Sequence, residues 1–280
     1  MNHKNRIPSY TPFIELKQNI DRSFEDNQLL GQLTKTTVVE ALFLFGFLDK
    51  PAIMLLLDQD DRNQGSFYRI VKSLLDEKVI KKIPSQYTKE KFVYALKPRA
   101  FTYYLDSKWK DEYQFNKNKM GLGVSATHRL SISKTCINIL KNYPNARIFT
   151  ERLIRQMHKA GRIELMRIPD ALLIDGEDYF FLEFEFSSKN RKDRREALIK
   201  ADMNCNIANE RYPNAHVMTY WYVNSASMWR LYEEEIEYLS SHGVEISSKG
   251  RLAERGRFAN QDYFGYLLEK GNHIVAKLGS

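Results

Sequence analysis

The chain has 280 residues, which is long for one compact domain and natural for two. Hydrophobic residues make up 43% of it, so it can bury a sizeable core, and wholesale disorder is excluded. Lysine and arginine total 43 against 35 aspartate and glutamate, and the resulting net charge of +8 favours a polyanionic partner.

The residue pattern gives no support to a membrane or secreted protein. The longest apolar run, residues 41–48, is far shorter than the roughly 20 residues that span a bilayer. Residues 1–13 contain no apolar core like that of a secretory signal peptide. Cys136 and Cys205 are the only cysteines, which excludes a disulfide framework and a Cys-x-x-Cys metal site. We therefore expect a cytoplasmic protein without a membrane partner.

A polar segment divides the chain in two. Residues 106–127 are rich in lysine, contain Gly121 and Gly123, and show no sustained periodicity. We interpret them as a linker between a domain over residues 1–105 and a second domain over residues 128–280. The expected fold class is α+β.

The first domain has the element order of a winged helix-turn-helix. Apolar residues at helical spacing predict three helices, over residues 34–47, 50–57 and 65–78. Two short strands follow, over residues 79–83 and 92–96, and the basic sequence PSQYTKEK joins them. Three helices followed by a basic hairpin is the order found in winged helices, which predicts DNA binding.

Two sets of side chains are the candidate DNA contacts. In a winged helix the third helix enters the major groove and the hairpin lies along phosphates. The candidate residues on the third helix are Asn63, Gln64, Ser66, Tyr68, Arg69 and Lys72. The candidate residues on the hairpin are Lys81, Lys82, Lys89 and Lys91. A helical domain with an ordinary polar surface, or a winged helix that binds proteins, is the alternative interpretation.

The second domain alternates helices and strands. A helix over residues 150–161, a strand within residues 163–174, a strand over residues 179–186, a long basic helix over residues 189–212 and a strand over residues 216–223 are predicted. This order suits a mixed α/β domain around a central sheet. Residues after about 225 give no comparable signal.

Carboxylates gather around one predicted hairpin of this domain. Asp170 starts its first strand, and Glu183 and Glu185 lie two apart on its second strand, so both glutamates emerge on one face. Pairing through the turn at Asp175-Gly176 would bring Asp170 beside Glu183. Grouped carboxylates are costly without positive charge between them, and Mg²⁺ or Mn²⁺ prefers such oxygen ligands. A solvated strand face is the alternative.

The long helix begins with a dense basic run. Its cations are Lys189, Arg191, Lys192, Arg194 and Arg195. Beside a strand of carboxylates, we expect these side chains to contact phosphates. A solvated helix face would also produce such a run.

The pattern resembles the PD-(D/E)xK nuclease superfamily. Pro169-Asp170 stands for the PD element and Glu183-Phe184-Glu185 for (D/E)xK, with Glu185 in place of the lysine. Some restriction endonucleases of the superfamily are similar, with an ExE element and an upstream helical glutamate, which Glu151 matches. The resemblance implies that Asp170 and Glu183 hold the metal. It also implies that Glu185 is a further ligand or helps to activate water, and that Lys189 contacts the scissile phosphate.

A narrower resemblance covers residues 34–224. A winged-helix pattern, then His128, TERLIRQ, RIPDALL and FLEFEFSSKNR, is similar to the MobC-type plasmid relaxases and the replication-relaxation proteins. This implies a metal-dependent nickase that acts at a plasmid transfer or replication origin. Its implied partners are origin DNA, accessory mobilisation proteins and a coupling protein, and a homodimer remains open.

Two other functions stay open at this point. One is a non-catalytic, sequence-specific DNA-binding accessory or initiator protein that keeps the nuclease fold. The other is a transcriptional regulator whose second domain dimerises or senses a signal. No P-loop, dinucleotide-binding or serine-hydrolase motif is present, so nucleotide and serine-hydrolase chemistry have no support.

Overall fold

The computed structural model describes residues 24–59, 64–105, 107, 125–143, 145–253 and 263–278. It is a mixed α+β structure with two compact units, which divide between Asn145 and Ala146. Asn63 and most of the predicted linker, residues 106–127, lie outside the described residues.

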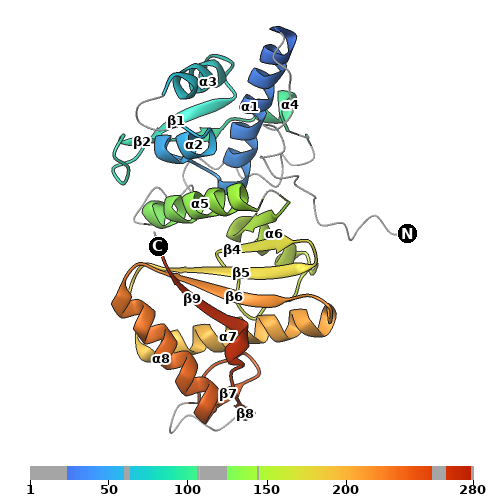
Figure 1. The fold of residues 1–280 in the computed structure, drawn as a ribbon, viewed down its shortest axis with the longest axis vertical. Helices are drawn as coiled ribbons and strands as arrows, with labels where there is room; N and C mark the ends of the chain where they lie inside the picture. Colours follow the sequence, from blue (N-terminus) through green and yellow to red (C-terminus); the bar gives the residue numbers. More distant parts are fainter. Residues whose placement is uncertain are drawn as a thin grey trace, which may run out of the picture. The chain divides into compact units, whose positions relative to one another are not determined.

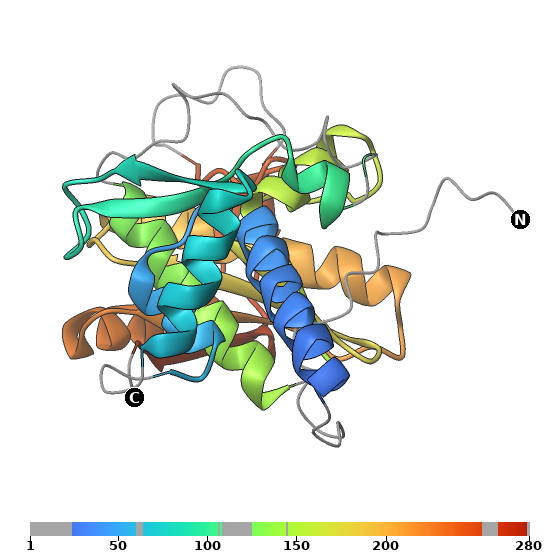
Figure 2. The ribbon, with the colours of Figure 1, turned by 90° about the horizontal axis from the view of Figure 1, so that it is seen from above.

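The N-terminal unit contains the three helices and the hairpin that the sequence predicts (Figure 1). Asp49 caps the second helix, because its side chain accepts a hydrogen bond from the backbone N–H of Ala52, and Pro51 fits the first turn. The hairpin is antiparallel and lies beside the helices (Figure 2). The elements are α1 (Phe24–Phe45), α2 (Lys50–Leu56), α3 (Gly65–Asp76), β1 (Ile80–Pro84), β2 (Phe92–Leu96), α4 (Ala100–Tyr103) and α5 (Ser125–Asn142).

Helix α5 belongs to this first unit, although the sequence pattern assigned residues 128–142 to the second domain. Ala126 and Leu130 of α5 pack into a buried cluster with Phe47, Val93 and Ala95. Apolar contacts of α5 with the N-terminal helices and hairpin therefore place the division between the units at Asn145 and Ala146, and His128 lies in the first unit.

The C-terminal unit is built on a five-stranded mixed sheet of order β3-β4-β5-β6-β9 (Figure 1). Strands β3, β4 and β5 pair antiparallel, whereas β6 pairs parallel with both β5 and β9. A second, two-stranded sheet joins β7 and β8. The elements are β3 (Arg147–Thr150), α6 (Glu151–Lys159), β4 (Ala171–Asp175), β5 (Asp178–Glu185), α7 (Arg191–Arg211), β6 (Val217–Val223), α8 (Ala226–His242), β7 (Val244–Ser247), β8 (Tyr263–Tyr266), η3 (Lys270–Asn272) and β9 (His273–Lys277).

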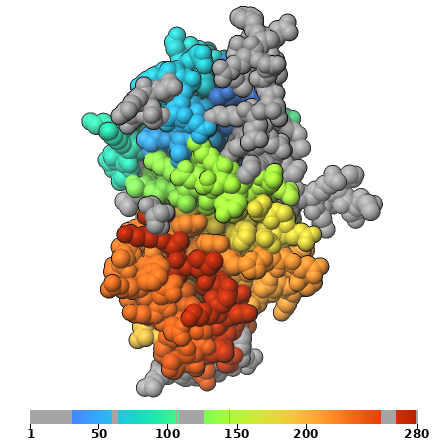
Figure 3. All heavy atoms as spheres, in the orientation of Figure 1, coloured from blue at the N-terminus to red at the C-terminus, as the bar shows by residue number. Residues whose placement is uncertain are grey.

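Helices pack against the sheet on the face that carries Trp221. Trp221 is fully buried and lies in one apolar cluster with residues of α7 and α8, while α6 contributes to a neighbouring cluster with β4 and β5. Strand β9 runs beside α8 on the surface seen in Figure 3. In the described part of the chain, every helix is too short or too polar to cross a membrane.

Candidate active site

The predicted hairpin places Asp170 and Glu183 opposite each other. Strand β4 begins directly after Asp170, and the register pairs Ala171 with Leu182, so Glu183 is the next partner along β5. The two-residue turn that sets this register has Gly176 at φ +61°, a conformation that glycine adopts without strain. The Asp170 carboxylate is fixed in place, since its Oδ2 accepts a 2.8 Å hydrogen bond from the backbone N–H of Phe184. The sequence-based pairing is therefore confirmed.

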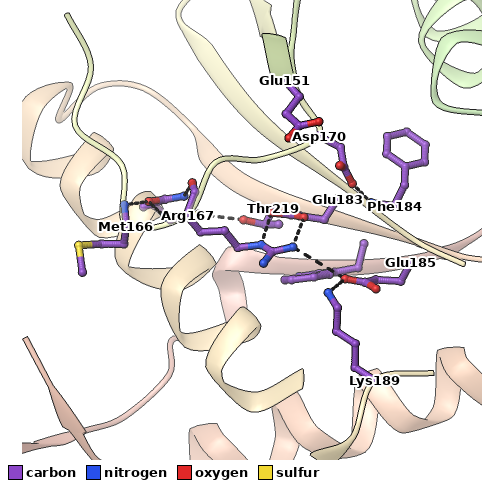
Figure 4. Close-up of polar contacts among 12 residues, drawn as sticks. Glu151, Met166, Arg167, Asp170, Glu183, Phe184, Glu185, Lys189 and Thr219 are labelled. Atoms are coloured by element: carbon purple, nitrogen blue, oxygen red, sulfur yellow. Dashed lines mark hydrogen bonds and ion pairs between the residues drawn. The ribbon is translucent and has the colours of Figure 1, made fainter. Parts of the chain in front are cut away.

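Glu151 reaches the same end of the sheet from α6. It is the first residue of this helix, and its backbone N–H donates to the carbonyl oxygen of Asp170 at 2.9 Å. The Glu151 side chain pairs with Arg155 one turn further along the helix, at 2.5 Å between Oε1 and Nη2. Figure 4 shows the Glu151 and Asp170 side chains side by side.

Glu183 is held by an arginine that the sequence analysis did not single out. Arg167 donates from Nε to Glu183 Oε1 at 2.7 Å and from Nη2 to Glu183 Oε2 at 2.8 Å (Figure 4). The same Nη2 lies 3.9 Å from Glu185 Oε1. Glu183 is only 1% exposed, so this bidentate ion pair is largely shielded from water.

Asn204 of α7 fixes the loop that carries Arg167. Its side-chain oxygen accepts from the backbone N–H groups of Met166, at 2.7 Å, and Arg167, at 3.4 Å. Its amide group donates to the carbonyl oxygen of Arg167 at 2.7 Å. The segment that carries Arg167 is irregular, so its backbone N–H and carbonyl groups have no strand or helix partners. The buried Asn204 side chain supplies these hydrogen-bond partners instead.

Glu185 pairs with Lys189, as their spacing of four residues allows. The Lys189 ammonium contacts Glu185 Oε1, and the backbone carbonyl of Lys189 accepts a 2.9 Å hydrogen bond from Arg194 Nη1. The structure thus places Asp170, Glu183 and Glu185 near one another, with Glu151 beside Asp170 and Lys189 beside Glu185.

Burial shifts the proton affinities of two of these carboxylates. Burial raises the pKa of Asp170 to about 6, the Phe184 N–H opposes this rise, and the neighbouring charges of Glu151 and Glu185 add to it. Burial also raises the pKa of Glu183 to about 7, although Arg167 acts in the opposite direction. Carboxylates with strongly perturbed pKa values that lie close together are typical of functional sites.

Replacing Asp170 by asparagine is expected to stabilise the protein at pH 8. The folded protein binds a proton at Asp170 more tightly than the unfolded chain does, so this group lowers stability as the pH rises from about 4 through about 6. Asparagine avoids that loss and can still accept from Phe184. Thermal melting in EDTA should show a midpoint roughly 2–4 °C higher at pH 8 and no difference at pH 3.

The exposed Glu164, changed to glutamine, is the control for this comparison, because it lies on the loop that leads to Asp170. A stabilisation of the same size at both pH values, or in the Glu164→Gln protein, would contradict the role of the raised Asp170 pKa.

The predicted phosphate contacts on α7 have a carboxylate partner in this structure. Arg191, Arg194 and Arg195 all place guanidinium nitrogens on Glu235 of α8, at 2.9, 3.3 and 2.6 Å. Three guanidinium groups against one carboxylate still leave surplus positive charge, and the Arg191 side chain is 65% exposed. Lys192 is exposed on the same turn.

The candidate DNA contacts of the N-terminal unit lie mostly at its surface. On α3, Tyr68, Arg69 and Lys72 are exposed, whereas Gln64 and Ser66 are partly buried. On the hairpin, Lys82, Lys89 and Lys91 are exposed and Lys81 is partly buried. Lys82 Nζ lies 4.6 Å from the centre of the Phe92 ring, a cation–π contact that holds this lysine against the strand.

The acidic cluster has the donor chemistry for a hard divalent cation, which takes oxygen ligands. In the present arrangement Arg167 occupies both oxygens of Glu183, and Lys189 contacts Glu185. Among the residues that the structure describes, no three His, Cys, Asp or Glu side chains form a group that could hold a metal ion. A cation at Glu183 would therefore compete with Arg167 for the same carboxylate.

Sequence reasoning missed Arg167, Asn204 and Glu235. Arg167 stands three residues before Asp170 in the sequence MRIPD. An arginine so close to a candidate metal ligand could have indicated an ion pair with the acidic cluster. Asn204 and Glu235 carry no local signal, because their partners are distant in sequence. Comparisons of the chain with protein-family models, with curated proteins and with solved structures give no match.

Proposed function

We propose that the protein is a metal-dependent DNA endonuclease with a winged helix-turn-helix unit and a PD-(D/E)xK-like unit. The observation that carries this proposal is the placement of Asp170 opposite Glu183 across β4 and β5, with Glu151 and Glu185 at the same end of the sheet. Following the resemblance to plasmid relaxases, its product is a nick at a transfer or replication origin.

The acidic cluster supplies the cleavage chemistry in this proposal. Asp170 and Glu183 would hold Mg²⁺ or Mn²⁺, with Glu185 as a further ligand or as the base for an attacking water. The bound ion would supply Lewis acidity toward the phosphate. Lys189, fixed through its backbone by Arg194, would offset negative charge that builds on the phosphate.

The N-terminal unit supplies DNA binding in this proposal. The exposed side chains of α3 are suited to base edges, and the hairpin lysines to phosphates. A surface hollow at the hairpin turn is lined by Ser85, Gln86, Thr88, Lys89 and Lys91, which offers hydroxyl, amide and ammonium groups to a phosphate.

Relaxation of a supercoiled plasmid that carries a candidate origin tests the proposal. The purified protein is incubated with Mg²⁺, Mn²⁺ or EDTA, and the products are separated on a gel. Open circles that form only with a divalent ion support a nickase, whereas linear product points to a double-strand endonuclease. Intact plasmid despite DNA binding refutes the catalytic proposal.

A second candidate is a DNA-binding accessory protein that keeps the fold without catalysis. The ion pair between Arg167 and both oxygens of Glu183 favours it, because a guanidinium stands where a catalytic cation would bind. This candidate predicts sequence-specific binding that EDTA does not change.

Changing Lys81 and Lys82 together to alanine is expected to weaken binding to every DNA sequence. Each phosphate contact that is lost should make the negative slope of log affinity against log salt less steep by about 1. The double variant should therefore reduce the magnitude of the slope by about 2. Fluorescence anisotropy at several salt concentrations measures both effects. Lys249 and Arg251, exposed in the C-terminal unit, provide a control variant with the same loss of charge. An unchanged slope in the hairpin variant would exclude the hairpin from DNA binding.

A further inference from the structure

We propose that Arg167 and a divalent cation are alternative partners of Glu183, so that metal loading of the acidic cluster is coupled to release of the Arg167 guanidinium. This inference rests on the proposed nuclease function and names a regulatory element of the same site.

Arg167 engages both oxygens of Glu183, so a cation would have to compete with the guanidinium for the same carboxylate. Nε and Nη2 of the guanidinium take one oxygen each, at 2.7 and 2.8 Å. Glu183 is 1% exposed, so bulk water barely reaches its oxygens while the guanidinium is in place. A cation and an arginine on the same two oxygens would also repel each other in a poorly solvated site.

Arg167 is held in this position before any ligand arrives. The three hydrogen bonds between Asn204 and the backbone of Met166 and Arg167 fix the start of the side chain. Asn204 itself is 2% exposed on α7, so the anchor is part of the core of the unit. Preorganisation of this kind favours the arginine over the cation and lowers metal affinity.

Glu185 is the nearest alternative carboxylate for a displaced guanidinium. Its Oε1 already lies 3.9 Å from Arg167 Nη2, so a small shift of the guanidinium exchanges one carboxylate partner for the other. The proposal therefore gives the site two arrangements, one in which Arg167 pairs with Glu183 and one in which Arg167 has left Glu183 for the Glu185 oxygen that Lys189 also contacts. A divalent ion would select the second.

Mn²⁺ binding by the full-length protein without DNA tests the coupling and needs no measurement of cleavage. Free Mn²⁺ is followed by electron paramagnetic resonance for the wild type, Arg167→Lys and Arg167→Ala. We expect Arg167→Ala to bind Mn²⁺ about tenfold more tightly, a usual size for coupling between two ligands. Arg167→Lys should be intermediate, because lysine keeps the charge but cannot span both oxygens. Arg162→Ala is the matched control, since it removes an exposed arginine from the same loop.

The wild type gives a second readout in case Arg167→Ala does not fold. The Nε–H of Arg167, identified by its loss in Arg167→Lys, should give a protected nitrogen-15 NMR signal that Mg²⁺ shifts or removes. Mg²⁺ binding with this signal unchanged, or Mn²⁺ binding equal or weaker in Arg167→Ala, overturns the coupling and leaves the metal site of the proposed function intact. Absence of metal binding in all variants overturns both.

Discussion

Replacing Glu183 by glutamine is expected to lower the rate of plasmid cleavage by at least about 10³-fold, while DNA affinity stays within about tenfold. Glutamine matches glutamate in size, and its one oxygen can still accept one of the two hydrogen bonds from Arg167, whereas its NH₂ group cannot accept the other. The variant therefore loses the negative charge that would hold the cation and part of the ion pair with Arg167, on a strand that lies between β4 and β6. Relaxation rates, anisotropy and a melting curve on the same samples separate catalysis from binding and folding.

Glu177 offers the matched control for this substitution. It lies on the same hairpin in the turn between β4 and β5, and it is exposed. Glu177→Gln should cleave at the wild-type rate. Cleavage by Glu183→Gln at the wild-type rate would show that the acidic cluster is structural and would leave DNA binding as the function to explain.

The placement of Asp170 and Glu183 could be predicted because it depends on local rules. Side chains alternate along a strand, which puts Glu183 and Glu185 on one face, and the two-residue turn of Gly176 and Glu177, next to the predicted Asp175-Gly176 signal, sets the register. A short turn leaves few ways to pair two strands. The hairpin is therefore the part of the site that periodicity alone could specify.

Arg167 could not be placed in the same way. It lies in an irregular loop between α6 and β4, and Asn204, which fixes this loop, comes from the middle of α7. No periodic pattern connects the two positions. An ion pair of this kind depends on tertiary packing, which a motif does not encode.

The basic run of α7 shows a related limit. Its composition predicts phosphate contacts, and helical periodicity places the arginines on neighbouring turns. It gives no information about Glu235, which reaches three of these arginines from α8. The charge that remains for DNA is therefore smaller than the sequence suggests.

The segment after residue 225 was missed because its contacts are non-local. Strand β9 completes the central sheet by pairing parallel with β6, and α8 and two short strands separate them in sequence. Parallel strands need long connections, so no hairpin turn in the sequence indicates that β6 and β9 pair. Polar residues on α7 tie this segment to the rest of the unit, and Asp202 is the most connected of them.

Replacing Asp202 by alanine is expected to destabilise the C-terminal unit by about 3–5 kcal/mol. Asp202 is fully buried on α7. It accepts hydrogen bonds from Tyr266 Oη at 2.7 Å, from Asn272 Nδ2 at 2.8 Å and from the backbone N–H of Glu269 at 3.2 Å. Alanine leaves these donors buried without their partner, which costs more than the hydrogen bonds themselves contribute.

Urea unfolding followed by tryptophan fluorescence measures this loss, because Trp221 is buried in the same unit. Glu210→Ala, an exposed change on the same helix, should stay within about 0.5 kcal/mol of the wild type. Asp202→Asn should fall between the two, since its one oxygen can still accept. A loss below about 1 kcal/mol in Asp202→Ala would mean that water or a rearranged side chain satisfies the donors. In that case apolar packing against α7 and β6 would hold the segment after β6. Its buried polar network would then add little to the stability of the sheet that carries the acidic cluster.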